Sequence, residues 1–406
     1  MASSSSSLLL LLCFSILSLV SSSPISLLLP ITKDHSTLQY LTTLSTGTPS
    51  APTNLVLDLG GSLPWFDCAS RHTPSSSLRT IPHRSLQCLT HQTQTSQTWL
   101  KTVADADQHH PCQIISENTI TGKTSAEGEL VEDLVELGSQ IPLLFTCSPT
   151  LLLNGLARTA SGMVGFGRSR ASFSTQFFNS FNAKRKITLC LSSSSGVVLL
   201  GGGLAYESEI LRSLTFTPLI NEPTSQEHLI SVNSIKIGGR RVSFNTASEG
   251  RNRGTLLSSV VPYTTMQSSV YATFESAYLR AAEAMNMTRV SPVGQFGLCF
   301  SSGGVGSSPV GPDVPVIELV LQSEMVKWRI YGRNSMVKVN SDVMCLGFLD
   351  GGVNQRNPIV IGGYQLEDVL VQFDFETSMV GFSSSLLMRQ SSCSNFRFGS
   401  GTAQSA

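Results

Sequence analysis

The stretch LVLDLGG, residues 55–61, places one acidic residue, Asp58, between an apolar run and two glycines. A short apolar run that ends in glycines is typical of a buried strand entering a tight turn. An isolated carboxylate is costly to bury unless other groups hydrogen-bond to it. Asp58 is therefore either one member of a catalytic group or a turn carboxylate that accepts hydrogen bonds from backbone amides.

The second half of the chain repeats this pattern at nearly the same interval. Asp58 precedes Gly165 by 107 positions, and Ser258 precedes Gly362 by 104. The stretches that contain these residues are LVLDLGG, SGMVGFG, GTLLSSVVPYTT and PIVIGGYQLED. Two strand-turn units, each followed by an apolar strand that ends in glycine, predict a duplicated fold. The alternative is coincidence among glycine-rich strands.

The composition supports a large core, because 41% of the 406 residues are hydrophobic and 13% are charged. The formal net charge of zero gives no reason to expect nucleic acid or an anionic membrane as a partner. The apolar run Leu8–Val20, followed by small residues, predicts a secretory signal peptide and an extracellular product. We expect a signal segment at 1–22, two lobes at 23–205 and 206–398, and a flexible tail at 399–406.

The cysteines point to disulfides. Cys13 lies in the signal segment, and an even number of exported cysteines then remains: Cys68, Cys88, Cys112, Cys147, Cys190, Cys299, Cys345 and Cys393. Residues alone leave their pairing open. His109 and His110 beside Cys112 offer poor ligand geometry, so we expect no metal site and no cofactor. Asn286 begins the sequon Asn-Met-Thr and is a candidate glycosylation site.

Short apolar runs punctuated by Gly, Ser, Pro and Asn predict a mainly β chain. The expected strands include 54–57, 128–137, 187–191, 197–200, 229–237, 316–321 and 369–373. Apolar residues at helical spacing predict one long helix over 267–287 and a second, shorter helix over 172–182.

The order and spacing of these motifs resemble the pepsin-like aspartic protease fold of the peptidase A1 family. The resemblance implies a bilobal molecule with two related β-barrel-like lobes and few short helices. In that family each lobe supplies a strand and turn with the pattern apolar-apolar-Asp-Thr/Ser-Gly, which a later apolar-apolar-Gly strand closes. The matching stretches of this chain are LVLDLGG, MVGFG, VIGG and VQFDFETSMVGFS.

Aspartic proteolysis needs two carboxylates that share one proton, because both cannot be charged at contact distance. Asp58 fits the first position, although Leu59 replaces the hydroxyl residue that usually follows it. The second position is Ser258, and no Asp or Glu occurs within the ten residues after it. A serine has no low-pKa proton to share, and no histidine lies nearby in sequence to activate it. We therefore expect no enzyme activity, with Asp58 as a remnant and Ser258 as the lost partner.

Two further departures agree with this expectation. Val260 stands where the glycine of the second turn is usual. The region 116–128, which corresponds to the hairpin flap of the family, contains no tyrosine.

The chain is more narrowly similar to a plant subgroup of the fold. This subgroup contains the xylanase and xyloglucan-endoglucanase inhibitors, the extracellular dermal glycoproteins and the basic 7S globulins. The stretches that carry the similarity are DLGG followed by WFDC, TLLSSVVPYTTM, GRNSMVKV and VIGGYQLEDVLVQFD. The resemblance implies that proteolysis is lost and that the scaffold blocks microbial cell-wall glycoside hydrolases, either xyloglucan-specific endoglucanase or xylanase.

The resemblance places the inhibitory loops in the second lobe, at 301–312 and 387–392. The candidate contact residues are Ser308, Pro309, Arg389 and Gln390. A cation such as Arg389 suits the acidic cleft of a glycosidase, whose two catalytic carboxylates must stay free. The first loop contains no Arg or Lys, which either counts against an inhibitor function or implies a different target. The alternative for Arg389 is an ordinary solvated surface charge.

The resemblance also implies four disulfides, Cys68–Cys147, Cys88–Cys112, Cys190–Cys393 and Cys299–Cys345. The expected product is an extracellular monomer of the apoplast or cell wall with a glycoside hydrolase as its protein partner. Two other functions remain open: an aspartic-type endopeptidase with residual activity, and a storage or peptide-binding protein like the basic 7S globulins.

Overall fold

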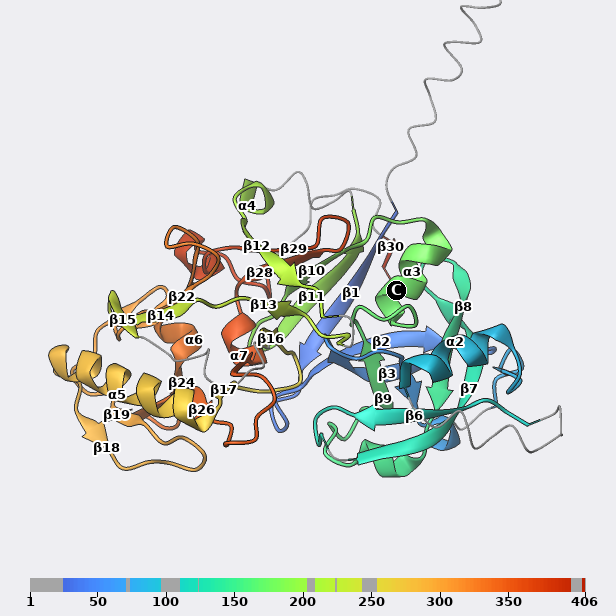
Figure 1. Ribbon diagram of the computed structural model, residues 1–406, viewed down its shortest axis with the longest axis horizontal. Coiled ribbons are helices and arrows are strands. Elements are labelled where there is room, and N and C mark those ends of the chain that lie inside the picture. The colour runs from blue at the N-terminus through green and yellow to red at the C-terminus, as the bar shows by residue number, and fades with distance from the viewer. Residues whose placement is uncertain are drawn as a thin grey trace, which may run out of the picture.

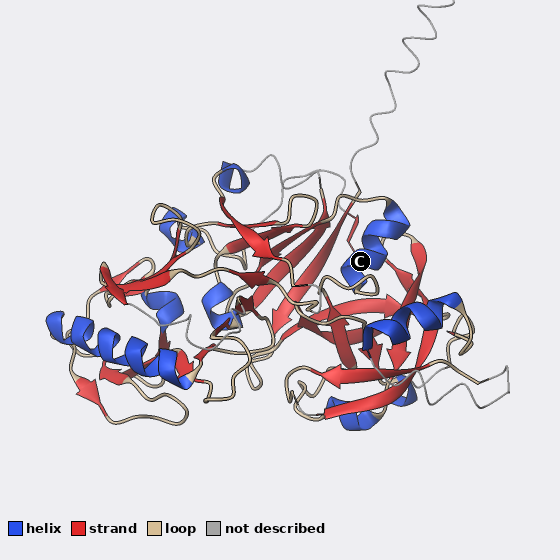
Figure 2. Ribbon diagram, viewed as in Figure 1, coloured by secondary structure: helices blue, strands red, loops and turns tan. Residues whose placement is uncertain are grey.

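The computed structural model describes residues 25–70, 74–95, 110–122, 124–202, 209–222, 225–242, 254–395 and 404–405. The expected signal segment 1–22 lies outside this range. Strands dominate both halves of the molecule, and helices are few and short, as the sequence predicts (Figure 2). No helix within the described ranges is long and apolar enough to cross a membrane.

A central antiparallel sheet joins the two halves of the chain (Figure 1). Its strands, in spatial order, are β1 (Ser26–Lys33), β11 (Ser195–Gly201), β10 (Lys186–Cys190), β28 (Leu370–Asp374), β29 (Met379–Phe382) and β12 (Thr215–Ile220). The junction lies between β10 and β28, where Leu189 faces Val371. Both strands are almost wholly buried, although polar residues interrupt the apolar ones in each sequence, KITLC and LVQFD. Residues far apart in sequence therefore share one core.

The first lobe is built on the right of Figure 1 from the N-terminal half of the chain. Its strands are β2 (Tyr40–Thr46), β3 (Ala51–Asp58), β4 (Trp65–Phe66), β5 (Arg79–Thr80), β6 (Gln113–Asn118), β7 (Thr124–Glu136), β8 (Gln140–Cys147) and β9 (Gly162–Gly165). Its helical segments are η1 (Cys68–Ser70), α2 (Leu86–Thr95), η3 (Thr150–Leu153) and α3 (Phe173–Phe181). Helix α3 matches the predicted short helix. Ser172 caps its start by accepting from the amide of Thr175 at 3.3 Å, and Asn182 ends it in a left-handed conformation.

The second lobe lies on the left of Figure 1. Its strands are β13 (Leu229–Ile230), β14 (Ser234–Ile237), β15 (Arg240–Val242), β16 (Thr255–Leu257), β17 (Thr264–Met266), β18 (Arg289–Val290), β19 (Cys299–Ser301), β20 (Ser307–Ser308), β21 (Gly311–Pro312), β22 (Ile317–Val320), β23 (Lys327–Ile330), β24 (Met336–Lys338), β25 (Val343–Leu346), β26 (Phe348–Asp350) and β27 (Ile359–Ile361). Its helical segments are α4 (Glu209–Arg212), α5 (Ser268–Ala284), α6 (Gly332–Ser335), α7 (Gly363–Leu366) and η5 (Leu386–Arg389).

Two expectations for this half need comment. Helix α5 occupies the predicted long helix and buries Val270, Phe274 and Tyr278 along one face. The single strand expected over 229–237 is instead two strands, β13 and β14, which pair in different sheets. The run changes sheets at Ser231–Asn233, where an alternating pattern alone gives no sign of a break.

The expected duplication is visible in the strand pairing. In the first lobe β3 runs parallel to β9, with Asp58 beside Gly165. In the second lobe β16 runs parallel to β27, and the amide of Ser258 donates to the carbonyl of Ile361 at 2.9 Å. A methyl group at Gly165 would lie 2.4 Å from the carbonyl oxygen of Gly61. A methyl group at Gly362 would lie 2.5 Å from the carbonyl carbon of Tyr263. Each lobe therefore needs a glycine where the closing strand meets the turn.

Four disulfides are formed, and they are the pairs that the resemblance implies: Cys68–Cys147, Cys88–Cys112, Cys190–Cys393 and Cys299–Cys345. The Cys190–Cys393 bridge links β10 to the segment that follows η5, so it holds the second expected inhibitory loop against the central sheet. Within the expected tail, Gln404–Ser405 form β30, a short strand parallel to β1.

Candidate functional site

Asp58 ends β3 in a cleft of about 620 Å³ that is lined mostly by the first lobe and partly by the second. Its side chain is 4% exposed. One carboxylate oxygen accepts from the amide of Gly60 at 2.9 Å, and the other accepts from the hydroxyl of Thr119 at 2.7 Å. Burial raises the pKa of Asp58 above its ordinary value, and these hydrogen bonds oppose the rise. The expectation that Asp58 is a turn carboxylate therefore accounts for its hydrogen bond from the amide of Gly60. Another hydrogen-bond donor, Thr119, comes from a hairpin that is distant in sequence.

That hairpin, formed by β6 and β7, covers the cleft and is fastened to the lobe at several points. The indole nitrogen of Trp65 donates to the carbonyl of Glu117 at 3.2 Å. The side chain of Asn118 donates to the carbonyls of Leu152 at 2.8 Å and Asn154 at 2.9 Å. Together with the Thr119 contact to Asp58, these bonds hold the hairpin tip against the cleft floor.

The second-lobe turn carries no acid. Ser258 follows β16 as Asp58 ends β3, and it is 6% exposed. Its hydroxyl oxygen accepts from the backbone amides of Val260 at 3.3 Å and Val261 at 3.2 Å. The hydroxyl is thus engaged within its own turn, and Ser258 is not among the residues that line the cleft.

The next residue, Ser259, joins the two lobes. Its hydroxyl accepts from the amide of Leu59 at 3.0 Å and donates to the carbonyl of Leu57 at 2.7 Å. The first turn is therefore supported from the second lobe, although Leu59 has no hydroxyl with which to return the contact. Sequence reasoning noted the loss of one hydroxyl and did not identify the role of the other.

Besides Asp58, the acidic residues Glu117 and Glu227 line the cleft, and sequence reasoning identified neither. Glu227 lines the cleft from the second lobe, where its side chain accepts from the hydroxyl of Ser225 at 3.1 Å and lies 3.8 Å from the guanidinium of Arg356. Its charge is the smallest of the effects on the pKa of Asp58. Glu227 lies outside the strand-turn motif, so the pattern gave no sign of it.

The two loops expected to inhibit a partner meet at a separate cavity of about 400 Å³. Ser308 and Pro309 line this cavity, as do residues on either side of Arg389. Arg389 and Gln390 themselves are exposed at the end of η5 and are not among the lining residues. The structure thus brings the two loops together.

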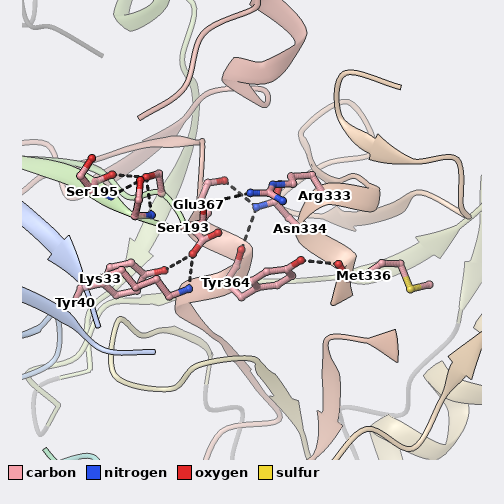
Figure 3. A network of polar contacts seen from close by, with 11 residues as sticks. Lys33, Tyr40, Ser193, Ser195, Arg333, Asn334, Met336, Tyr364 and Glu367 are labelled. Atoms are coloured by element: carbon pink, nitrogen blue, oxygen red, sulfur yellow. Dashed lines mark hydrogen bonds and ion pairs between the residues drawn. The ribbon is translucent and has the colours of Figure 1, made fainter. Parts of the chain in front are cut away.

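A buried polar network connects the lobes beside this cavity (Figure 3). The ammonium group of Lys33 lies 2.6 Å from the carboxylate of Glu367, which also accepts from the hydroxyl of Tyr40 at 2.9 Å. The side chain of Asn334 donates to the backbone carbonyls of Tyr364 at 3.0 Å and Glu367 at 2.8 Å. A first-lobe lysine and tyrosine are in this way fixed to a second-lobe glutamate, which holds the surrounding loops in place.

The remaining expected residues lie apart from both cavities. Asn286 is exposed just after α5 and has a positive φ of 57°, so the sequon is accessible. Cys112 forms a disulfide, which removes it from metal binding. Across the described ranges, no group of three or more His, Cys, Asp or Glu side chains is placed to hold a metal ion.

Comparison with known proteins agrees with this architecture. The family model described as Xylanase inhibitor N-terminal matches residues 40–202, and the model described as Xylanase inhibitor C-terminal matches residues 227–384. Probable aspartic proteinase GIP2 of Nicotiana benthamiana is 41% identical over 92% of this chain and 92% of its own length. Gamma conglutin 1 of Prunus dulcis is 33% identical over 93% of this chain and 90% of its own length.

Solved structures give the same result. The crystal structure of edgp superposes with a TM-score of 0.82 at 39% identity and covers 94% of this chain and 100% of that one. The crystal structure of basic 7S globulin from soybean superposes with a TM-score of 0.78 at 30% identity and covers 92% and 100%. With both lobes matched in order and over nearly their whole length, the chain belongs to the xylanase inhibitor family, which has the bilobal pepsin-like fold.

Proposed function

We propose that this chain is a secreted inhibitor of microbial cell-wall glycoside hydrolases and that it does not cleave proteins as an aspartic protease does. The observation that carries the second half of the proposal is the turn at Ser258. Its hydroxyl is engaged with the amides of Val260 and Val261, at the position where proteolysis requires an acid.

The chemistry of the missing group is specific. In aspartic proteolysis one carboxylate accepts a proton from the attacking water while its partner protonates the carbonyl of the scissile bond. A serine hydroxyl is too weak an acid for either step at the pH at which such enzymes work. Asp58 is further engaged by Thr119, whose hydroxyl occupies one carboxylate oxygen. The hairpin that supplies Thr119 also restricts access of a polypeptide to the cleft floor.

The inhibitor half of the proposal rests on the second lobe. Two loops, around Ser308 and around Arg389, converge beside one cavity. The Cys190–Cys393 disulfide anchors the second loop to the central sheet, and the hydrogen bond from the amide of Arg333 to the carbonyl of Val310 ties the first loop to α6. Rigid loops suit inhibition, because little conformational freedom is lost on binding. Glycoside hydrolases need two free carboxylates in an open cleft, so a protein surface that covers this cleft stops catalysis.

Secretion is part of the same proposal. Four disulfides are typical of an oxidising compartment, and the exposed sequon at Asn286 is accessible to a glycosyltransferase. Expression of the full chain in a plant cell culture, followed by mass spectrometry of the medium, tests this directly. We expect a product that begins near Ser22 and carries a glycan at Asn286. Retention of the uncleaved chain inside the cell would contradict the proposal.

The inhibitor function is tested by titrating the purified protein against a fungal xyloglucan-specific endoglucanase and a fungal xylanase. We expect loss of hydrolysis of at least one polysaccharide with a one-to-one complex on size exclusion. The absence of a complex with both enzymes would refute the inhibitor function.

One observation favours a second candidate, a residual aspartic-type endopeptidase. Glu227 is a carboxylate in the same cleft as Asp58. Its side chain is already engaged by the hydroxyl of Ser225 and lies 3.8 Å from the guanidinium of Arg356, which is why we favour the inhibitor. Cleavage of denatured haemoglobin at acid pH, blocked by pepstatin and lost in both Asp58→Asn and Glu227→Gln, would support the endopeptidase instead.

A further inference from the structure

The cavity between the two second-lobe loops contains a cation that no expected site includes. Arg333 lines this cavity together with Asp368, Pro309, Leu387 and several serines. The serines are Ser192, Ser193, Ser308, Ser392 and Ser394. The lining is therefore rich in hydroxyl groups around one guanidinium.

The backbone fixes where Arg333 sits. Its amide donates to the carbonyl of Val310 at 2.7 Å, which ties helix α6 to the β20–β21 hairpin. A methyl group at Gly311 would lie 2.3 Å from the Arg333 nitrogen, and one at Gly332 would lie 2.0 Å from the carbonyl oxygen of Pro312. Because these glycines allow the hairpin and the helix to touch, the base of the arginine is held firmly by the first expected inhibitory loop.

The guanidinium itself is available to a ligand. Arg333 is exposed, and one of its terminal nitrogens donates to the hydroxyl of Ser193 at 3.3 Å (Figure 3). Within the part of the chain that the structure describes, no carboxylate lies within ion-pair distance of this side chain. Asp368, the acid in the lining, accepts from the amide of Cys393 at 2.9 Å. Burial raises the pKa of Asp368 and the charge of Arg333 acts to lower it by less, so the two side chains interact without forming an ion pair. A guanidinium carries five donors, so most of its hydrogen-bonding capacity is unused.

We propose that this cavity receives an acidic side chain from the surface of the partner and that Arg333 is the residue that binds it. The inference rests on the proposed inhibitor function, since it assigns the partner as a glycoside hydrolase. A planar guanidinium pairs with a carboxylate through two parallel hydrogen bonds. The hydroxyl of Ser193 and the Ser392–Ser394 pair add neutral donors, and the cavity is large enough for an Asp or Glu side chain.

The assignment differs from the one expected from sequence. Arg389 protrudes at the end of η5, whereas Arg333 lies within a concave site. An arginine in a concave site can be reached only by an acidic side chain that protrudes from the partner. Its ligand therefore lies on the surface of the partner and is not the catalytic pair at the base of the partner's cleft. Inhibition by this chain therefore uses a contact outside the catalytic centre of the hydrolase.

The test compares four proteins in calorimetric binding to the fungal endoglucanase or xylanase that the wild type inhibits. They are the wild type, Arg333→Gln, Arg333→Lys and the matched surface control Arg280→Gln, which removes an exposed arginine from helix α5. We expect Arg333→Gln to weaken binding by at least about 30-fold and to reduce its dependence on salt. Arg333→Lys keeps the positive charge but lacks the planar guanidinium that forms two parallel hydrogen bonds, so it should recover part of the affinity.

The outcomes separate the two claims. If the wild type binds neither enzyme, the inhibitor function and this inference both fail. If the wild type binds and Arg333→Gln behaves like Arg280→Gln, the inference alone is overturned, and a large loss in Arg389→Gln would then assign the cation to η5. Thermal melting of each variant checks the fold. Should Arg333→Gln be unstable, a double-mutant cycle between Arg333→Lys and acidic-to-amide variants of the hydrolase decides the question, because coupling to no acid would refute the pair.

Discussion

The two strand-turn units differ in what they have kept. The first retains its acid, Asp58, and has lost the hydroxyl that should follow it. The second has that hydroxyl, Ser259, and carries Ser258 at the position that matches Asp58. The backbones still match, since each turn lies beside a parallel strand that ends in glycine. The surviving hydroxyl supports the opposite turn through Leu59 and Leu57.

This difference separates what the fold requires from what proteolysis requires. The closing glycines and the Ser259 contact hold the backbone of both turns in place. The second turn needs no acid for support, because Ser258 satisfies the amides of its turn without a charge. The pepsin-like scaffold can therefore form with one acid in place of two.

The largest expected effect tests whether the two turns are structurally equivalent. Gly165→Ala places a methyl group 2.4 Å from the carbonyl oxygen of Gly61, and Gly362→Ala places one 2.5 Å from the carbonyl carbon of Tyr263. Backbone atoms cannot move aside as a flexible side chain does. We expect each variant to lose at least about 3 kcal/mol of stability in urea unfolding.

Gly303→Ala is the matched control, because its nearest neighbour is the Ser301 hydroxyl at 3.5 Å. It should change stability by less than about 0.5 kcal/mol. A large loss in Gly165→Ala without one in Gly362→Ala would show that the second turn is no longer under the same constraint, and the equivalence would fail.

The second prediction concerns His228, a buried histidine of the second lobe that contacts Phe166 of the first lobe. A ring nitrogen of His228 lies 3.1 Å from the carbonyl oxygen of Phe166, and its backbone carbonyl accepts from Leu257 just before Ser258. Burial lowers the pKa of His228 to about 4, whereas the unfolded chain titrates near 6.5. Between these values the unfolded state binds more protons, so stability falls as the pH drops from 6.5 to 4.

We expect this residue to cost about 2 to 3 kcal/mol of stability between pH 7.5 and pH 4.5. Urea unfolding at the two pH values measures the change. His228→Phe, which suits a site packed against the rings of Phe373 and Phe375, should remove this part of the pH dependence. The exposed His35→Phe should leave it intact. Equal pH dependence in the wild type and His228→Phe would contradict the prediction.

Local sequence patterns predict much of this fold but little of its candidate functional sites. The strand before Asp58 and helix α5 follow from the apolar pattern, because each depends on neighbours a few residues away. The closing glycines were identified by the repeated spacing of the two halves, although the contacts that require them are with Gly61 and Tyr263, far away in sequence. The hydrogen bond from Thr119 to Asp58 spans 61 positions, and the one from Ser259 to Leu57 spans 202. Such contacts depend on how the strands are ordered in the sheet, which no local pattern specifies.

The same reason explains why sequence gave no sign of the cavity cation. Arg389 lies in the expected loop just before the last cysteine, so the family resemblance pointed to it, and its role stays a prediction. Arg333 becomes a cavity residue because β20–β21 folds onto α6 and the β10–β11 loop approaches from the first lobe. The family resemblance pointed to the two loops, and the packing between them places Arg333 in the cavity that they share.

The smallest expected effect compares the two serines of the second turn directly. Ser259→Ala removes one buried acceptor and one buried donor, which leaves the amide of Leu59 and the carbonyl of Leu57 without this partner. Because Leu57 and Leu59 are fully buried, water cannot replace the hydroxyl, and we expect a loss of about 2 kcal/mol. Ser258→Ala removes two long contacts within one turn and should cost about 1 kcal/mol.

Urea unfolding of the two single variants and of the double variant measures both costs and their coupling. Which of the two variants loses more stability matters more than the size of either loss. A greater loss of stability in Ser259→Ala means that the hydroxyl between the lobes supports the first turn. It also means that the side chain of Ser258 contributes little to the stability of the scaffold. If Ser258→Ala is the more damaging change, the side chain at the lost acid position is itself a support of the scaffold. The catalytic role of this position could then not be separated from its structural role. The presence of Ser258 in place of an acid would need a structural explanation as well as a chemical one.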